Sequence, residues 1–365
     1  MKVLQIGADR SKRGILYEGS PAFLRQQEYA KRFGQLDIIG FSRVSDGAKK
    51  VIRGTLTIHP TNSRSRWVYM RDALRIVKTL PKPDVVSAQD PFETGLVGWW
   101  IARKYQVPLH VQVHTDFLSP EYRRHSATNR IRVFLAGFVL RRAAGIRAVS
   151  DRIQESIQER YRPDVPVTVL PIFVDVGQFR NAIPDAALAG RFRSFATKIL
   201  VVSRLEAEKN VQLALRAFAA SAPLDSCLII VGAGSEETSF KHFAKRLNVA
   251  ERVFFEGPRD VAPYYQLADV VLVPSRYEGY GLVIVEALAG GVPVLSTDVG
   301  IAREVGAIVT SGEKFADALA EWFKNGPRTG ELKNYPYKSF DEYVRAYCED
   351  IESCVKAQKG HTTAI

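Results

Sequence analysis

Cysteine is scarce in this chain of 365 residues, which contains only three. An odd number of cysteines argues against a disulfide framework, and Cys227, Cys348 and Cys354 lack the spacing of a metal-binding cluster. A long hydrophobic run is also absent, because no stretch of about 18 uncharged apolar residues occurs, and so no membrane-spanning helix is expected. The first residues, MKVLQIGADR, lack the apolar region and cleavage site of a signal peptide and are expected to form a strand. These absences predict a cytoplasmic protein.

Acidic residues are few in the first half of the chain. Residues 1–178 hold 29 Lys and Arg against 16 Asp and Glu, a formal charge of +13, whereas the whole chain carries +12. The remainder is therefore close to neutral. The densest basic stretch runs from Tyr122 to Ser150, where no acid occurs. It contains seven arginines: Arg123, Arg124, Arg130, Arg132, Arg141, Arg142 and Arg147.

Apolar residues recur at helical spacing within this basic stretch, at Ile131, Phe134, Leu135 and Phe138. One interpretation is a buried helix face with a solvated basic edge. Another is a surface for the anionic headgroups of a membrane's inner face, or for an acceptor that bears phosphate. Nucleic acid is not expected as a partner, because aromatic residues for base stacking are not interleaved with the arginines.

Short apolar and β-branched runs alternate with longer helical patterns along the chain. Pro and Gly mark their boundaries, and the spacers are long enough for crossover helices, so the runs predict strands of parallel, doubly wound sheets. The first strands are expected at residues 3–7, 36–41, 84–89, 109–114 and 145–150. The same order then repeats, with strands expected at residues 197–203, 226–232, 252–257, 270–275 and 292–297.

Two such series predict an α/β protein of two Rossmann-like domains, which the length of the chain also favours. We place an N-terminal domain at residues 1–175 and a second domain at residues 176–337. The linker between them is expected near Pro171 and Gly177. Residues 338–365 are predicted to form a helix that packs back on the N-terminal domain, followed by a short frayed end.

The most informative motif is the string EGYGLVIVEALAGG, which begins at Glu278. Glu278 follows a predicted strand and opens a Gly-rich turn, and Glu286 lies eight residues later in the next helix. Gly279 and Gly281 permit a tight turn, and the helix that begins near Leu282 points its first amides at the same place. Both carboxylates are expected on one helix face, where they reach one extended ligand. The string therefore predicts a diphosphate site.

This string resembles the E-x7-E signature of the family 4 retaining glycosyltransferases, which have the GT-B fold of two Rossmann-like domains facing each other across a cleft. The resemblance implies that residues 1–175 form an acceptor-binding domain and residues 176–337 a nucleotide-sugar-binding domain. It also implies that Glu278 contacts hydroxyls of a donor sugar and that Glu286 binds the ribose of the nucleotide. It assigns the diphosphate to the turn between the two acids, and thus to Gly279, Tyr280, Gly281, Leu282 and Val283.

Three further segments resemble parts of the same family. Arg204 and Lys209, in SRLEAEKN, follow the first strand of the second domain, and the family gives such a pair the role of neutralising the departing diphosphate. His114, in HTDF, follows a strand where relatives carry a histidine that contacts the sugar near its reacting carbon. Gly19, in EGS, corresponds to the glycine loop that covers the phosphates.

The resemblance implies a retaining glycosyltransferase that moves a hexose-type sugar from GDP-mannose or a UDP-sugar to a glycan or lipid-linked acceptor. No Asp-x-Asp pair occurs, so the metal-bridged site of the other main glycosyltransferase fold is not expected, and neither a metal nor a cofactor is predicted. Two alternatives stay open: a non-catalytic protein that binds sugar nucleotides, and a sugar-nucleotide epimerase of the same fold. A glycosidase is disfavoured, because a nucleotide-binding turn between its two carboxylates would serve no purpose.

Overall fold

The computed structural model of the protein describes residues 1–8 and 14–362, with side chains up to residue 356. It divides into two compact units. The first consists of Met1–Pro171 together with Tyr337–Ile365, and the second of Ile172–Pro336. The sequence analysis places the boundaries after residues 175 and 337.

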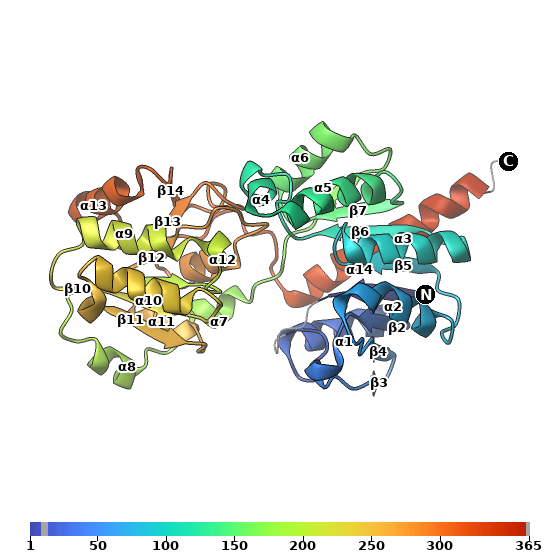
Figure 1. The fold of residues 1–365 in the computed structure, drawn as a ribbon, viewed down its shortest axis with the longest axis horizontal. Helices are drawn as coiled ribbons and strands as arrows, with labels where there is room; N and C mark the ends of the chain where they lie inside the picture. The colour runs from blue at the N-terminus through green and yellow to red at the C-terminus, as the bar shows by residue number, and fades with distance from the viewer. Residues whose placement is uncertain (9–13, 363–365) are drawn as a thin grey trace. The chain divides into compact units, whose positions relative to one another are not determined.

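The first unit is built around an eight-stranded sheet in the described part of the chain, with the order β3-β4-β2-β1-β5-β6-β7-β8 (Figure 1). The strands are β1 (Lys2–Gly7), β2 (Gln35–Gly40), β3 (Val51–Arg53), β4 (Leu56–Pro60), β5 (Val85–Ala88), β6 (Leu109–Val113), β7 (Gly145–Ala148) and β8 (Val167–Val169). The helices are α1 (Pro21–Phe33), α2 (Tyr69–Val77), α3 (Glu93–Tyr105), α4 (Pro120–His125), α5 (Ala127–Leu140), α6 (Asp151–Tyr161) and α14 (Phe340–Thr362).

The second unit is built around a six-stranded sheet with the order β11-β10-β9-β12-β13-β14, in which all neighbouring strands are parallel. The strands are β9 (Thr197–Val202), β10 (Ser226–Val231), β11 (Val253–Gly257), β12 (Val270–Val273), β13 (Val294–Thr297) and β14 (Ile308–Thr310). The helices are α7 (Val176–Arg180), α8 (Ala186–Arg191), α9 (Val211–Ser221), α10 (Glu237–Arg246), α11 (Ala262–Leu267), α12 (Leu282–Ala289) and α13 (Phe315–Asn325). The two units confirm the prediction of two Rossmann-like domains.

All ten predicted strands are present, but the prediction missed β3, β4, β8 and β14 and assigned the chain near β8 to a linker. These short strands lie at or next to sheet edges, and β3, β8 and β14 are only partly buried, so their sequences lack a long apolar run. The expectation of an entirely parallel first sheet is wrong for β3, which pairs antiparallel with β4. Only two residues connect these strands, and a parallel pair would need a long crossover.

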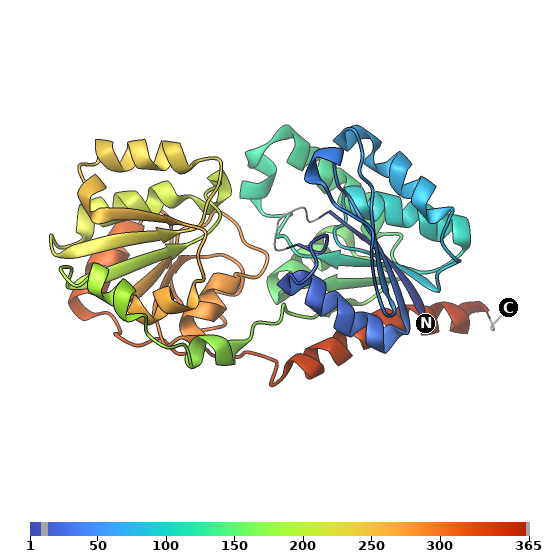
Figure 2. The same cartoon turned by 90° about the horizontal axis from the view of Figure 1, so that it is seen from below.

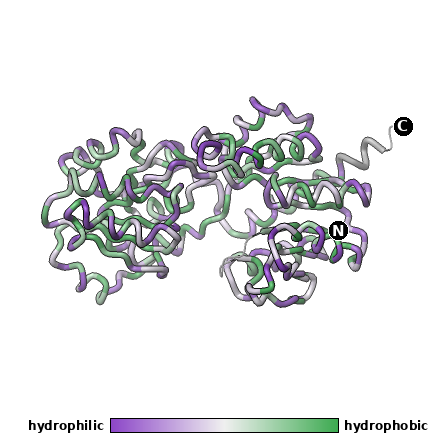
Figure 3. The backbone as a smooth tube through the Cα atoms, viewed as in Figure 1, coloured by the Kyte–Doolittle hydropathy of each residue, from purple (hydrophilic) through white to green (hydrophobic). Residues whose placement is uncertain are grey.

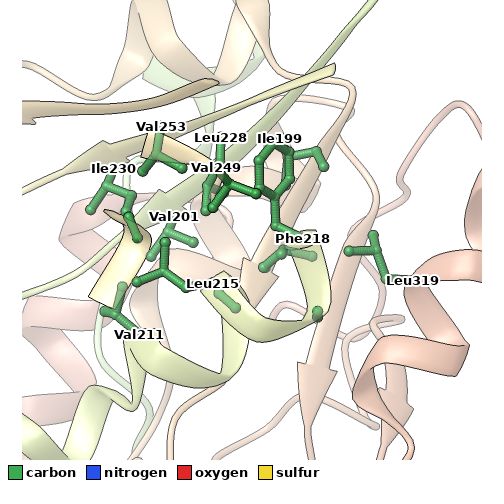
Figure 4. Packing of buried hydrophobic residues seen from close by; sticks show 14 of the residues in the cluster. Ile199, Val201, Val211, Leu215, Phe218, Leu228, Ile230, Val249, Val253 and Leu319 are labelled. Atoms are coloured by element: carbon green, nitrogen blue, oxygen red, sulfur yellow. The ribbon is translucent and has the colours of Figure 1, made fainter. Parts of the chain in front are cut away.

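The core of the second unit lies between its sheet and the helices α9, α10 and α13 (Figure 4). Ile199 and Val201 in β9 contribute alternate side chains, and Leu215 and Phe218 in α9 contribute residues three apart, so each set lies on one face. None of the four is more than 1% exposed. This packed layer holds in place the loops that leave the carboxyl ends of the strands.

Helix α14 packs on the sheet of the first unit, where it contacts β5, β6, β7 and α1 (Figure 2). Its buried face carries Tyr343, Tyr347, Ile351 and Cys354, spaced as one stripe of an α-helix. Figure 3 shows hydrophobic and hydrophilic residues alternating along helices of each unit, as expected for helices with one buried face. Within the residues that the structure describes, no helix combines the length and hydropathy needed to span a bilayer.

Candidate functional site

The loops that follow β9 and β12 meet at the carboxyl edge of the second unit's sheet. The two strands are parallel neighbours, so their carboxyl ends lie side by side. The amide of Arg276 donates to the carbonyl of Glu208 at 2.8 Å, which joins the two loops directly. Ligands of open parallel sheets bind at this edge.

Lys209 and Glu278 form an ion pair between these loops. Nζ of Lys209 lies 2.6 Å from Oε1 of Glu278, and Oγ of Ser275 donates to the same oxygen at 2.8 Å. The two charged side chains are 16% and 17% exposed. Oε2 of Glu278 has no hydrogen-bond partner among the residues described, and the ammonium group has further N–H donors. The pair therefore offers an acceptor to hydroxyl groups and a cation to an anion.

The turn that ends at Gly281 leads directly into α12. Gly281 is the N-cap of this helix and has a φ of +97°, which a residue with a Cβ adopts only with strain. The amides of Leu282 and Val283 stand in the first helical turn, ahead of the hydrogen bonds within the helix. Gly279 and Tyr280 are buried, so the ring of Tyr280 points away from solvent. This geometry suits an anion.

Glu286 lies in the second turn of α12, whereas Glu278 lies in the loop before that helix. The expectation that both carboxylates stand on one helix face is therefore wrong, because only Glu286 is helical. The hydroxyl of Tyr265, in α11, donates to Oε2 of Glu286 at 2.8 Å. Burial raises the pKa of Tyr265, and Glu286 raises it further, so the hydroxyl keeps its proton. Tyr265 thus fixes one oxygen of the Glu286 carboxylate.

Arg204 extends from the loop after β9, and 70% of its side chain is exposed. It pairs with Glu208 at 2.8 Å. The structure therefore brings Lys209 and Glu278 into direct contact, whereas Arg204 stands beside them with a different acidic partner. A side chain with this exposure can turn toward a ligand at little cost.

A G-x-G turn after β10 supports the loop that carries Arg204. The amide of Leu205 donates to the carbonyl of Ala233 at 2.9 Å. A Cβ on Gly232 would lie 1.8 Å from the carbonyl oxygen of Ser203, and one on Gly234 would lie 2.3 Å from that of Leu205. Both positions need glycine because the two backbones touch here.

In the first unit, His114 directly follows β6, at the carboxyl edge of the sheet. The side chain is half-buried, and its Nε2 lies 3.2 Å from Oε1 of Gln112. Burial, followed by the charges of Arg147, Arg25 and His110, lowers the pKa of His114 to about 3. The imidazole is therefore neutral at physiological pH and acts through hydrogen bonds.

Gly19 lies in the loop between β1 and α1, the place of the predicted glycine loop. It is exposed and has a φ of +80°. The next residue, Ser20, caps α1 by accepting a hydrogen bond from the amide of Phe23 at 3.0 Å. Residues 9–13 of the same loop lie outside the described residues.

Asp90 is a candidate residue that sequence reasoning missed. It follows β5 and stands at the same sheet edge as His114, because β5 and β6 are parallel neighbours. Burial raises the pKa of Asp90 to about 6, although hydrogen bonds from Phe92 and Thr94 oppose the shift. Its carboxyl group therefore changes charge near pH 6. The position of Asp90 directly after a predicted strand was a signal that could have identified it.

Two family models match the chain. The family described as "Glycosyl transferase 4-like domain" matches residues 40–172, and the family described as "Glycosyl transferases group 1" matches residues 191–339. The chain belongs to the group 1 glycosyltransferases. The second match includes every site residue proposed in the second unit of this glycosyltransferase, and the first includes His114, whereas Gly19 lies outside both.

Curated relatives of this group 1 glycosyltransferase carry different donor and acceptor names. It is 28% identical over 241 residues to the alpha-monoglucosyldiacylglycerol synthase of Streptococcus pneumoniae. The match covers 61% of this chain and 54% of the relative. It is 27% identical over 240 residues to the lipopolysaccharide core biosynthesis mannosyltransferase LpsB of Rhizobium meliloti. The match covers 60% of this chain and 65% of the relative. The chain thus spans about half to two thirds of the length of these relatives.

Solved structures match the whole length of this glycosyltransferase. The Anabaena protein HepE, in complex with UDP and glucose, superposes with a TM-score of 0.70 at 21% identity and covers 100% of both chains. The sucrose-phosphate synthase of Thermosynechococcus elongatus superposes with a TM-score of 0.72 at 16% identity, over 100% of this chain and 98% of that one. These likenesses confirm that the two Rossmann-like domains form the GT-B fold.

Proposed function

We propose that this group 1 glycosyltransferase moves a hexose-type sugar, with retention, from a nucleotide-diphosphate donor to a glycan or lipid-linked acceptor. GDP-mannose and the UDP-sugars are the donor classes. The names of the relatives support this choice, because one is a monoglucosyldiacylglycerol synthase and another is a mannosyltransferase of lipopolysaccharide core biosynthesis. The UDP and glucose bound by HepE support a nucleotide sugar as the donor.

The observation that carries the proposal is the Lys209–Glu278 pair beside the first turn of α12. Oε2 of Glu278 would accept from sugar hydroxyls, and the amides of Leu282 and Val283 would bind the phosphates. Further along α12, Glu286 would accept from the ribose. The site thus offers a hydrogen-bond acceptor at Glu278, then a cation and amides, and then a second hydrogen-bond acceptor at Glu286. A nucleotide sugar presents its groups in the same order: sugar hydroxyls, phosphates and ribose hydroxyls.

In the proposed reaction, the bond between the anomeric carbon and the phosphate oxygen breaks, and its electron pair leaves with the diphosphate. Lys209, Arg204 and the N-terminus of α12 stabilise the charge that develops, an effect of about 3–4 kcal/mol for one well-placed donor. The acceptor oxygen bonds to the carbon on the same face, and its proton passes to the departing phosphate. Because the chain itself supplies this positive charge, we propose transfer without a metal or a cofactor.

We also propose that an anionic membrane surface on the cytoplasmic side brings the protein to a lipid-linked acceptor. On α5, Ile131 is 61% exposed and Phe134 is 78% exposed, three residues apart on one face. The interpretation of a buried stripe is therefore wrong for these two residues. Arg123 and Arg130 are also exposed and form no ion pair with a residue that the structure describes. Exposed apolar groups flanked by arginines are typical of a helix that lies on a membrane surface.

Three of the seven arginines do not supply an unbalanced charge to this surface. Arg147 is 2% exposed and lies inside the first unit. Arg132 pairs with Glu93 at 2.9 Å and Arg124 pairs with Glu121 at 3.2 Å, so their charges are balanced within the chain. The sequence analysis includes all three in the basic stretch because charge density alone does not reveal which side chains are buried or paired.

Thermal unfolding in the presence of nucleotides tests the donor part of the proposal. A ligand at about 100 times its Kd stabilises the folded state by ~2.7 kcal/mol, which raises the Tm by several degrees. UDP or GDP, and the matching nucleotide sugar, are expected to raise the Tm, whereas NAD is the negative control. A Tm that no nucleoside diphosphate changes would contradict the donor site.

Incubation with the same nucleotide sugars, with and without an acceptor, separates the alternative functions. Donor binding without transfer to any acceptor would identify a non-catalytic protein that binds sugar nucleotides. Conversion of one sugar nucleotide into another, without an acceptor, would identify an epimerase.

A further inference from the structure

A row of buried polar side chains crosses the sheet of the first unit on the side that α14 covers. Gln5 in β1 is in register with Ser87 in β5, and Ser87 is in register with His110 in β6. Gln112, two residues further along β6, is in register with Arg147 in β7. All five side chains are at most 2% exposed. Polar groups buried to this extent need hydrogen-bond partners, so the partners show which side chains the row holds in place.

The side-chain amide of Gln112 is fixed at both of its ends. Its Nε2 donates to Oγ of Ser87 at 3.1 Å and to the hydroxyl of Tyr347 at 2.8 Å. Its Oε1 accepts from Nη1 of Arg147 at 3.0 Å. A guanidinium carries only N–H donors, so the amide atom that faces it must be the oxygen. The contact with Arg147 therefore fixes which end of the amide is oxygen and which is nitrogen.

His114 contacts the same oxygen of Gln112, with its Nε2 at 3.2 Å. A carbonyl oxygen can only accept, so Nε2 must carry the proton, and Nδ1 keeps its lone pair. Nδ1 makes no hydrogen bond to any residue that the structure describes. A second proton would add a cation near Arg147, Arg25 and His110, which all act against the imidazolium form.

Helix α14 holds the two residues that orient His114. The hydroxyl of Tyr347, which accepts from Gln112, donates in turn to Oε1 of Gln5 at 3.2 Å. The hydroxyl of Tyr343 accepts from Nη2 of Arg147 at 3.3 Å. Both tyrosines lie on the buried face of α14, so this helix is part of the support of His114.

We propose that Gln112 and Arg147, held by α14, are positioning residues that fix His114 as the neutral Nε2–H tautomer with Nδ1 as a free hydrogen-bond acceptor. The consequence for recognition rests on the proposed function. His114 accepts a hydrogen bond from a hydroxyl group of the sugar or the acceptor, and through Nδ1 it cannot donate one to a phosphate or carbonyl oxygen.

NMR of the protein labelled with 15N-histidine tests this inference without any assay of activity, because nitrogen–proton correlations distinguish the two neutral tautomers and the charged form. The spectrum of His114→Gln identifies the signals of His114. The wild-type protein is expected to show only the Nε2–H form of His114 from about pH 5.5 to about pH 8.5, the range in which an ordinary histidine changes charge. An Nδ1–H or a charged His114 in this range would overturn the inference.

Two variants test the role of the positioning residues. Gln112→Leu removes the fixed oxygen and is expected to give a mixture of both tautomers of His114. Tyr347→Phe keeps the packing of α14 and removes one hydrogen bond to the Gln112 amide, but Arg147 still faces its Oε1, so it is expected to cause the same change to a much smaller extent. Gln266→Leu, a half-buried glutamine of the second unit, is the matched control and leaves the signals unchanged. An unchanged tautomer in Gln112→Leu would contradict the assignment.

Kinetics separate this inference from the proposed function. Gln112→Leu is expected to lower kcat about tenfold and to leave the KM for the donor within about twofold, as for a residue that acts on the reacting group rather than on ground-state binding. The predicted tautomer in a protein that transfers no sugar would contradict the proposed function and support the positioning role. A changed tautomer with an unchanged kcat would overturn the inferred contact between His114 and the substrate.

Discussion

At the scale of single residues, the proposed function requires Lys209 and Glu278 to serve both the free protein and the bound donor. Without a ligand, the carboxylate balances the ammonium at 2.6 Å. A diphosphate would bring its own negative charge to Lys209, and the Glu278 carboxylate would then be available to sugar hydroxyls. The half-buried position strengthens both interactions relative to solvent-exposed charges.

Glu278→Gln is expected to keep the binding of nucleoside diphosphates and to lose sugar transfer. The substitution removes the counter-ion of Lys209, so the Kd for the diphosphate stays the same or falls, whereas the transfer rate falls by about 100-fold or more. Titration calorimetry measures the Kd, and release of the diphosphate measures the rate. Glu313→Gln, an exposed acid of the same unit, is the matched control. Full transfer by Glu278→Gln would refute the role of this carboxylate.

Tyr265→Phe is expected to weaken nucleotide binding, because its hydroxyl fixes Glu286 at 2.8 Å. A hydrogen bond to a charged group contributes about 1.5–3 kcal/mol, which corresponds to a Kd at least about tenfold higher. The neighbouring Tyr264→Phe is the control, since the hydroxyl of Tyr264 donates to Glu256 instead. Equal nucleotide affinities in the two variants would show that Tyr265 does not position Glu286.

Sequence reasoning proposes candidate site residues that follow strands, and it misses the residues that contact them. Glu278, Lys209 and His114 each stand close after a recognisable apolar run. Tyr265 lies 21 residues from Glu286, and nothing in the local sequence connects the two. For Gln112 a signal did exist, because a polar residue in the middle of the buried run LHVQVH must have a partner.

At the scale of secondary-structure elements, α14 is attached to the sheet by a buried hydrogen bond between an aspartate and a histidine. Oδ2 of Asp350 lies 2.9 Å from Nε2 of His110, which is fully buried. Burial alone would raise the pKa of Asp350, but the hydrogen bond and charge of His110 hold it below its usual value. The folded pKa is therefore lower than the unfolded one. Ionised Asp350 stabilises the folded protein above about pH 4, and this contribution is lost as the pH falls below that value.

Asp350→Ala is expected to lower the free energy of unfolding by about 1–3 kcal/mol at pH 7, because it leaves a buried group of His110 without its partner. The loss should be smaller near pH 3, where the wild type has itself lost part of the contribution of Asp350. Urea unfolding at the two pH values measures the difference. Glu349→Ala, an exposed acid on the same helix that forms no ion pair with a described residue, is the control. An equal loss at both pH values would contradict the role of the ionised carboxylate.

Helix α5 is expected to bind vesicles that contain anionic lipids, through Ile131 and Phe134 and the exposed arginines. Each basic residue near such a surface contributes about 1 kcal/mol, so binding should weaken as salt is added. Co-sedimentation should show less bound protein for Ile131→Ser/Phe134→Ser and for Arg123→Glu/Arg130→Glu. Ile183→Ser, an 84% exposed residue of the second unit, is the matched control. Wild-type protein that stays in the supernatant at low salt would refute the membrane surface.

Helical periodicity predicts that α5 is a helix but not which face of it is covered. The residues that pack inward are small or lie late in the helix, such as Ala136, Val139 and Leu140. The larger Ile131 and Phe134, which a hydrophobicity pattern places inside, lie outside. The covering surface comes from elements distant in sequence, so the pattern of α5 alone could not identify it.

At the scale of the whole molecule, the repeated order of buried strands was sufficient to predict two Rossmann-like domains. Central parallel strands are covered on both faces, so their sequences are continuous apolar runs. The ten predicted strands are therefore the central ones, together with β11 at one edge of the second sheet. Edge strands such as β3 and β14 carry no such run. The antiparallel pairing of β3 depends on a two-residue connection rather than on hydrophobicity.

Transfer is expected to persist in EDTA, because in the proposed reaction Lys209, Arg204 and the N-terminus of α12 would supply the positive charge that a metal supplies in other enzymes. The rate of diphosphate release is compared before and after chelation, and again after Mg²⁺ or Mn²⁺ is added in excess. Loss of activity that either metal restores would contradict transfer without a metal.

The most direct test of the proposed function is a transfer assay with a panel of UDP-sugars and GDP-mannose, with lipid and glycan acceptors supplied together. The nucleoside diphosphate released and the sugar attached to the acceptor are measured for the wild type and for Glu278→Gln. We predict that the wild type consumes one class of donor, attaches one sugar for each diphosphate released and retains the anomeric configuration. Glu278→Gln should bind the same nucleotide without this reaction. Wild-type protein that binds a nucleoside diphosphate but consumes no donor, or a Glu278→Gln variant as fast as the wild type, would contradict the proposal.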